Sequence, residues 1–431
     1  MSTIRVCGGR VVTPEGTHEA DVVVTDGVIA ALEPCGSEPQ GRNGQEVDAR
    51  GCVVLPGGVD PHSHLLSDIA PASISALHGG TTTALTFTAP RADETPAAAY
   101  RRAQDEEVPL AAIEIGLHPS IWEPALLTSA DRAELAGLGA LTIKHFLGYP
   151  ELRMMTSDRT LYESLRHGSE VGLLTLVHCE NGDAIDARVD EAIAAGRTDV
   201  RAFVWARHPE LEEEAVARTL ALARVAGAAV YLVHISTAGS LDLVRAARAQ
   251  GQQVWAEACT HHLLLDESVY DRPDAERFLV VPPLRPRRDV DALWRAVADG
   301  TIDTVGSDHA QVAYQPPFPP DDFRGLPYGF PGAELRVPLV LSEGARRGVA
   351  LERLVDVLAT APARIFGLEP RKGAIAPGAD ADLVLWDPEP GWTVHADELH
   401  DGLGVSPFEG LQVTGRIRQV VRAGRIEPGI E

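Results

Sequence analysis

Several side chains that bind metal ions or carry protons stand at the ends of apolar runs in this sequence. His62 and His64 are two residues apart in the motif DPHSH, directly after one such run. Residues i and i+2 of an extended segment point to the same side, and neutral imidazole is a common protein ligand for zinc. In isolation the pair would indicate two surface histidines. Further ligand-type side chains, however, lie in or directly after other apolar runs: Lys144, His178, His234 and Asp308.

Each of the later candidates also has an ordinary interpretation when it is taken alone. His178 and His234 follow apolar runs, where a core histidine with satisfied hydrogen bonds is common. Asp308 is also consistent with a cap on a helix or turn. Six ligand-type side chains that converge on strand ends favour a metal centre over these separate interpretations. Three more histidines are interpreted as groups that pack around or support the ligands: His261, His262 and His309.

Lys144 is the unusual member of the set because it lies inside the apolar run LTIKHFL. A buried lysine costs several kcal/mol unless it is paired or neutralised, and histidines offer it no counter-charge. A lysine that CO₂ converts to a carbamate would be anionic, with two oxygens that bridge two cations. The alternatives are a lysine with a buried stem and a solvated head, or an ammonium that binds substrate.

The elements that must position these residues are short apolar runs that alternate with amphipathic segments between about residues 56 and 370. The intervening segments, such as 212–227 and 241–251, place apolar residues at helical spacing and end in Gly. Strand–helix alternation predicts the α/β class and a parallel (β/α)₈ TIM-type barrel, whose strand ends meet at one rim. A doubly wound open sheet is the rival, but no G-x-G-x-x-G follows the first strand. The eight runs are 52–60, 81–89, 111–118, 141–147, 173–178, 229–234, 252–258 and 302–309.

Both ends of the chain are different in character from this middle part. IRVCGGRVV and ADVVVTDGVIAAL near the start, and ADLVLWDPEP and GRIRQVVRAGRI near the end, are rich in β-branched residues and separated by turn signals. We therefore expect a small β-sandwich-like domain built from both termini, residues 1–55 plus 372–431, and a catalytic barrel over residues 56–371.

Composition excludes several classes of function. The 431 residues include 38 Lys and Arg against 62 Asp and Glu, a net charge of −24, which disfavours nucleic acid and anionic membranes as partners. The five cysteines show no CxxC spacing, which disfavours a disulfide framework or a Cys₄ zinc site. No signal-peptide pattern and no run of 18 apolar residues is present, so we expect a cytoplasmic protein.

Taken together, the motifs resemble the amidohydrolase superfamily. The resemblance includes DPHSH, the lysine of LTIKHF, VHCEN, VHIS, GSDHA, AEACTHHLLLD, VPPLR, PGAELRVPL and the C-terminal stretch TAPARIFGLEPRKGAIAPGADADLVLWDP. It covers nearly the whole chain. Within the superfamily the sequence is most similar to the cyclic-amide branch, namely dihydropyrimidinase (hydantoinase), with allantoinase and dihydroorotase as relatives.

The resemblance implies a binuclear metal site, with zinc as the usual ion and manganese or cobalt as alternatives. His62, His64 and Asp308 would hold one ion, and His178 and His234 the other. N6-carboxylated Lys144 would bridge the two ions together with a hydroxide. The hydroxide would open a hydantoin or dihydropyrimidine ring, with Asp308 as proton shuttle.

The resemblance also implies contacts with the substrate. Hydantoinases carry a Tyr at the place of Tyr149, where it donates a hydrogen bond to the developing oxyanion. Val281 and Tyr328 stand where hydantoinases have Ser and Asn, and backbone groups there would bind the ring. Leu66 stands where dihydroorotases carry an Arg that binds the substrate carboxylate.

Other functions remain open at this point. Allantoinase or dihydroorotase activity is the enzymatic alternative, and a non-catalytic hydantoinase-like scaffold protein is the alternative from another class. The expected partner is a small cyclic amide. The family also suggests a homo-oligomer, a dimer or tetramer.

Overall fold

Parallel strands that alternate with helices form the middle of the chain, which is the predicted α/β arrangement. The computed structural model describes residues 3–36, 44–310, 322–326 and 328–428. Each of the eight predicted runs overlaps one of the parallel strands. These are β6 (Gly58–Ser63), β7 (Thr81–Phe87), β8 (Glu114–His118), β9 (Thr142–Phe146), β10 (Leu174–His178), β11 (Val230–Leu232), β12 (Val254–Cys259) and β13 (Thr304–Gly306).

The parallel strands pair in chain order within two sheets. One sheet has the order β6-β7-β8 and the other the order β13-β12-β11-β10-β9. Isolated parallel bridges join Ser63 to His309 and Ser120 to Lys144. The first bridge connects β6 with the segment after β13, and the second connects the segment after β8 with β9, so the two sheets are linked at both ends. Because all these strands run in the same direction, their carboxyl ends lie on the same side.

Most residues of the parallel strands are buried, as expected for parallel strands covered by helices. Leu176, Tyr231 and Ala256 on three neighbouring strands are fully buried. The long helix α7 (Pro209–Ala226) buries Ala215 and Val216 in one hydrophobic cluster with Ala256, and it is capped by Gly227, whose positive φ of 66° suits a residue without a side chain.

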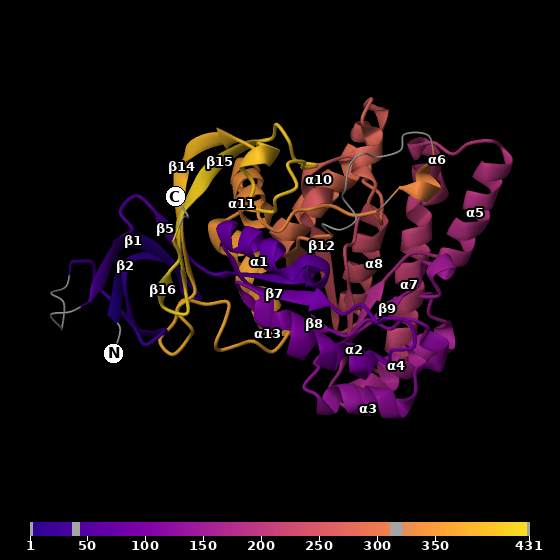
Figure 1. Cartoon of the computed structure of the whole chain (residues 1–431), viewed down its shortest axis with the longest axis horizontal. Coiled ribbons are helices and arrows are strands. Elements are labelled where there is room, and N and C mark those ends of the chain that lie inside the picture. The colour runs from indigo at the N-terminus through magenta and orange to yellow at the C-terminus, as the bar shows by residue number, and fades with distance from the viewer. Residues whose placement is uncertain (1–2, 37–43, 311–321, 327, 429–431) are drawn as a thin grey trace.

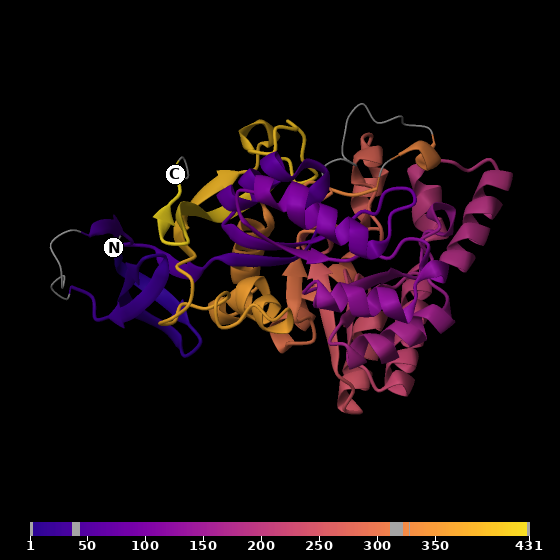
Figure 2. The same ribbon diagram turned by 60° about the horizontal axis from the view of Figure 1, so that its bottom comes forward.

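The helices lie between successive strands and cover them on the outside (Figures 1 and 2). They are α1 (Ile69–His78), α2 (Pro96–Arg102), α3 (Ser129–Gly137), α4 (Asp158–Glu170), α5 (Gly182–Ala194), α6 (Val200–Ala206), α7 (Pro209–Ala226), α8 (Ala238–Ala249), α9 (Thr260–Leu264), α10 (Arg287–Asp299), α11 (Arg336–Arg346), α12 (Leu351–Val355) and α13 (Ala361–Ile365). Within the described ranges, none of them is long and apolar enough to span a membrane.

A further sheet combines strands from both ends of the chain, in the order β16-β15-β14-β5-β1-β2-β3 with β4 paired to β1. Figure 1 shows it at one end of the molecule, with indigo and yellow strands side by side. Its strands are β1 (Thr3–Thr13), β2 (Gly16–Thr25), β3 (Val28–Glu33), β4 (Gln45–Asp48), β5 (Val53–Pro56), β14 (Leu383–Thr393), β15 (Gln412–Arg422) and β16 (Arg425–Ile426).

The first predicted run, 52–60, divides between the two kinds of sheet. β5 pairs with β1 and β14, whereas β6 pairs with β7. Gly57 separates them, and a Cβ at this position would lie 2.1 Å from Oγ1 of Thr82. The chain therefore passes from one sheet to the other at a point where only glycine fits.

Candidate metal centre

Three of the predicted ligands meet where β6 and β13 end. His62 lies in β6, His64 follows that strand, and Asp308 lies two residues after β13. The Nε2 atoms of His62 and His64 are 3.1 and 3.2 Å from Oδ1 of Asp308. Two imidazoles and a carboxylate at this separation form a group that could hold one divalent cation.

Two more predicted ligands meet at the ends of β10 and β11. His178 is the last residue of β10, and His234 lies two residues after β11. Nδ1 of His178 is 2.9 Å from Nε2 of His234. Burial lowers the pKa of both imidazoles, so both are neutral and have lone pairs for a metal ion.

Lys144 lies between these two groups. Its Nζ is 4.7 Å from the centre of the Phe87 ring and 5.1 Å from that of Phe146. Phe87 packs against His62, and Phe146 packs against His178. The lysine therefore lies near one phenylalanine that packs against the first ligand group and one that packs against the second.

The two lysines of the chain differ in their surroundings. Lys372 has carboxylate oxygens of Asp380, Asp382 and Glu114 within 3.1 Å. Lys144 is 1% exposed and has no carboxylate within 4.0 Å in the described part of the chain. Burial lowers the pKa of Lys144 to about 8. The neutral amine, which is the form that reacts with CO₂, is therefore more accessible in Lys144 than in an exposed lysine.

The charge distribution of the first group also fits a cation. Burial opposes a positive charge on His62, but Glu257 and Asp308 raise its pKa to about 9. Burial would likewise raise the pKa of Asp308, but His62 and His64 lower it well below its usual range. The group therefore attracts positive charge, which a proton supplies here and a divalent cation would supply in its place.

Buried carboxylates fix the orientation of the histidines. Oε1 of Glu257 accepts a hydrogen bond of 2.6 Å from Nδ1 of His62 and one of 3.0 Å from the backbone N–H of His234. Oε2 of Glu180 accepts a hydrogen bond of 3.1 Å from Nε2 of His178. In both imidazoles the other ring nitrogen is thus directed to the ligand group, as metal-binding histidines require.

A third carboxylate joins the two strands that carry the first group. Oδ1 of Asp60 accepts hydrogen bonds from the backbone N–H groups of His62 and Ser307, at 3.2 and 3.0 Å. The guanidinium of Arg336, which is fully buried, is 3.8 Å from the other oxygen of Asp60. This connection holds the ends of β6 and β13 together and so positions His62 relative to Asp308.

Sequence reasoning missed Glu257, Glu180 and Asp60 as supporting residues. Each is at most 2% exposed and lies in or beside an apolar run, as in AEAC, HCEN and VDPH. A buried acid in such a run needs a partner, and that signal could have identified them.

Three of the predicted site residues have a strained backbone. Tyr149, His234 and Asp308 have φ angles of 61°, 39° and 49°, in the left-handed region. Such conformations cost about 1–3 kcal/mol each for residues with a Cβ and are concentrated at functional sites. Here they direct three side chains away from the regular path of the strands.

Tyr149 lies beside the second ligand group. Its ring centre is 4.9 Å from that of His178, and burial, with Glu180 nearby, raises the pKa of its hydroxyl well above the ordinary value. The hydroxyl therefore stays protonated and can donate a hydrogen bond.

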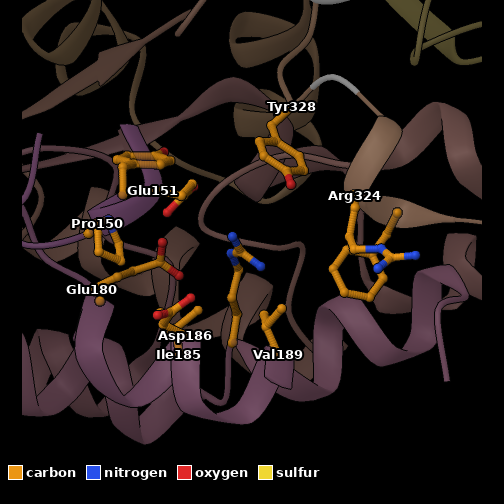
Figure 3. Close-up of a pocket in the computed structure, with 13 residues that line it drawn as sticks. Pro150, Glu151, Glu180, Ile185, Asp186, Val189, Arg324 and Tyr328 are labelled. Atoms are coloured by element: carbon orange, nitrogen blue, oxygen red, sulfur yellow. The ribbon is translucent and has the colours of Figure 1, made fainter. Parts of the chain in front are cut away.

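A cavity of about 190 Å³ opens next to Tyr149. Tyr328 also lines it, and Figure 3 shows Tyr328 across the cavity from Asp186 and Val189 of α5. The third predicted substrate contact, Val281, is buried in the hydrophobic cluster against which both tyrosines pack. The three predicted substrate contacts thus share one region of the structure.

The remaining histidines lie outside the two ligand groups. Nδ1 of His309 accepts hydrogen bonds from the backbone N–H groups of Gly332 and Ala333, which is a packing role. His261 and His262 lie in α9 with their rings 4.3 Å apart.

Comparison with known proteins gives a consistent result. The model of the Amidohydrolase family matches residues 53–426. The chain is 36% identical over 434 residues to the D-hydantoinase of Geobacillus stearothermophilus, covering 96% of this chain and 91% of that protein. It is 34% identical over 437 residues to the D-hydantoinase of Ralstonia pickettii, covering 98% and 94%. The solved structure of the dihydropyrimidinase from Brevibacillus agri NCHU1002 superposes with a TM-score of 0.91 at 33% identity, covering 98% of this chain and 94% of that one.

Proposed function

Because the chain belongs to the amidohydrolase family, we propose that it is an enzyme that opens a cyclic amide of the hydantoin or dihydropyrimidine type. Its similarity to D-hydantoinases and to a dihydropyrimidinase over nearly the full length supports this activity. The observation that carries the proposal is the position of Lys144 between the His62–His64–Asp308 group and the His178–His234 pair. A non-catalytic scaffold would not need all six of these side chains.

For the architecture, we infer that β6 to β13 form one closed (β/α)₈ barrel. The two isolated bridges between the parallel sheets support this inference. We also propose that the chain divides into a catalytic barrel, residues 56–371, and a small β domain, residues 1–55 plus 372–431. The sheet built from both termini supports this division, although residues 1–2, 37–43 and 429–431 lie outside the described ranges.

Two divalent metal ions, with zinc as the expected species, fit the donor atoms. His62, His64 and Asp308 would hold one ion, His178 and His234 the other, and N6-carboxylated Lys144 both. When bound, such ions lower the pKa of water and polarise the amide carbonyl. Glu257 and Glu180 keep the imidazole tautomers that leave the ligand nitrogens free.

The remaining chemistry belongs to two side chains. The Asp308 carboxylate, whose pKa is depressed, would accept the proton released when water adds to the amide and deliver it to the leaving ring nitrogen. The Tyr149 hydroxyl, which stays protonated, would donate a hydrogen bond to the carbonyl oxygen as negative charge develops on it. Backbone groups near Val281 and Tyr328 would hold the ring.

The residues at two positions favour hydantoinase over dihydroorotase activity. Leu66 offers no charge to a ring carboxylate. Arg285, the nearest alternative in the sequence, is 3% exposed and already binds Glu212 at 3.4 Å and the carbonyl of Arg207 at 2.7 Å. A buried carboxylate without a partner is costly. The cavity does contain Arg207, whose Nε and Nη1 make no hydrogen bond to the described residues, so the preference for neutral rings rests on Leu66 and on the similarity to D-hydantoinases.

A hydrolysis panel tests the proposal: hydantoin, both enantiomers of a 5-substituted hydantoin, dihydrouracil, allantoin and dihydroorotate, with metal content measured on the same sample. We expect a neutral cyclic imide to exceed dihydroorotate by at least about 100-fold in kcat/KM, roughly 2.7 kcal/mol. If dihydroorotate were the best substrate, the choice of branch would be wrong, and Arg207, which lines the cavity, would be the cation that binds its carboxylate. If the enzyme hydrolysed none of these rings, that result would contradict the proposal itself.

A further inference from the structure

A second group of metal-binding side chains lies where β12 passes into α9, outside the centre described above. Cys259 is the last residue of β12, and His261 and His262 are in the first turn of α9. One ligand atom from each of the three lies within 4.8 Å of the other two. All three residues are at most 2% exposed. The sequence had suggested only packing or supporting roles for the two histidines.

The two imidazoles have ring nitrogens for which the described protein offers no partner. Nε2 of His261 and Nδ1 of His262 are buried and make no hydrogen bond. Buried polar atoms are almost always satisfied, so two adjacent exceptions need an explanation.

His262 is already oriented as a metal ligand. Its Nε2 donates a hydrogen bond of 3.0 Å to the carbonyl oxygen of Pro282. This bond fixes the tautomer with the proton on Nε2 and leaves a lone pair on Nδ1, the atom without a partner. A histidine that donates from one nitrogen to a carbonyl and coordinates through the other is the usual arrangement at metal sites.

In the described residues the thiol of Cys259 makes only a long contact, although Cys259 also forms a group within 4.8 Å with His62 and Glu257. Its Sγ is 4.0 Å from Oε1 of Glu257, a long contact for a thiol donor. The Glu257 carboxylate already accepts hydrogen bonds from Nδ1 of His62, the N–H of His234 and the hydroxyl of Tyr231. The sulfur is therefore available to the two histidines of α9.

From this geometry we propose that Cys259, His261 and His262 bind a third metal ion, a thiophilic cation such as Zn²⁺. Thiolate and imidazole are the ligands that select this class of ion. Ligands of a tetrahedral zinc ion with bonds of about 2.0–2.3 Å stand roughly 3.3–3.8 Å apart, so side-chain shifts of about 1 Å complete the site. On binding, the thiol loses its proton to solvent and the sulfur coordinates as thiolate.

The ion would be structural and not catalytic. Three protein ligands leave the fourth position of a tetrahedral ion to water or to a further group. Because the three ligands are at most 2% exposed, substrate does not reach the ion, and we assign it a role in local structure. Here the ion would fix the turn from β12 to α9, two residues after Glu257, which orients His62. The proposal does not depend on the substrate, because it uses none of the residues assigned to the catalytic centre.

Cobalt provides a selective test, because thiolate-to-cobalt charge transfer absorbs in the near ultraviolet and the proposed catalytic ligands include no thiolate. The protein would be produced with Co²⁺ as the added transition metal, and its absorption and cobalt content measured. We expect the wild type to show the thiolate band. Cys259→Ser should lose this band and should also bind one equivalent of cobalt less per chain than the wild type. His262→Gln should weaken or remove the same band.

Two other thiols serve as matched controls. Cys35 is exposed and Cys52 is buried in the terminal sheet, so Cys35→Ser and Cys52→Ser should keep the band. Folded wild-type protein without a thiolate band would overturn the proposal, whether or not Cys259→Ser folds. A band that survives in Cys259→Ser, or disappears in Cys35→Ser, would overturn it as well. Hydrolysis of the substrate panel is measured separately, and it tests the proposed function independently of the cobalt results.

Discussion

Nδ1 of His178 and Nε2 of His234 face each other at 2.9 Å, although 56 residues separate them in the chain. The cause is the register of two neighbouring strands: Val177 of β10 pairs with Leu232 of β11, so the residues that follow leave the sheet side by side. One ring nitrogen of each imidazole therefore points into the same small space, where a metal ion could bind both. The same principle brings His62 to Asp308, and it explains how distant segments build one centre.

Lys144 is predicted to be essential for metal binding. Lys144→Ala removes the group that stands between the two ligand sets and should lose both metal and activity. Short carboxylic acids or bicarbonate should restore part of each, because a small anion can occupy the place of the carbamate. The measurements are metal content and turnover.

Lys372→Ala is the matched control for Lys144, since Lys372 is also buried but is paired with carboxylates. It should lower thermal stability and leave the metal content per folded chain unchanged. A Lys144→Ala enzyme with full metal content and wild-type turnover would rule out the bridging role.

Asp308 is assigned two tasks that one substitution separates. Asn keeps the shape and one ligand oxygen but cannot carry a proton. Asp308→Asn should therefore retain most of the metal and lose about 10²–10⁴-fold in kcat, the range for general acid–base catalysis. An unchanged kcat would show that another group moves the proton.

Tyr149 should affect the chemical step more than binding, because its hydroxyl acts on charge that develops in the transition state. Tyr149→Phe should lose about 10²–10³-fold in kcat, with nearly normal KM and metal content. Tyr100→Phe, which alters a buried tyrosine of α2, should leave kcat unchanged. A loss below about threefold in Tyr149→Phe would assign this residue to packing instead.

Glu257 is predicted to act through His62 and not on the substrate. Glu257→Gln keeps the shape but weakens the hydrogen bond to Nδ1 of His62, so metal affinity should fall by about 10–100-fold. Excess metal should restore most of the activity, whereas it should not rescue Asp308→Asn. Metal titrations of both variants make the comparison, and equal behaviour would contradict the positioning role.

Much of the fold was predictable because parallel strands that are buried on both faces leave continuous apolar runs in the sequence. Lys144, His178 and Asp308 could be identified as candidates for a related reason, since polar residues in or after such runs are easily recognised. The division of the first run at Gly57 was not predictable, because it depends on the close approach of Thr82 from another strand.

The supporting contacts of the centre were beyond sequence reasoning. Glu257 and His62 are 195 residues apart, and only the folded sheet brings them to 2.6 Å. The cavity beside Tyr149 likewise combines α5 with Tyr328, whose approach no local pattern encodes. Local periodicity gives the elements and their ends, but the side-chain partners depend on how those ends meet.

Removal and restoration of the metal tests the central claim most directly. The protein is treated with a chelator, and hydrolysis of a 5-substituted hydantoin or dihydrouracil is measured before treatment, after it, and after addition of Zn²⁺ with and without bicarbonate. Our account predicts that activity disappears with the metal and returns most fully when Zn²⁺ and bicarbonate are both supplied, because the carbamate of Lys144 must form again. Metal-free protein that opens the ring at the original rate would contradict it.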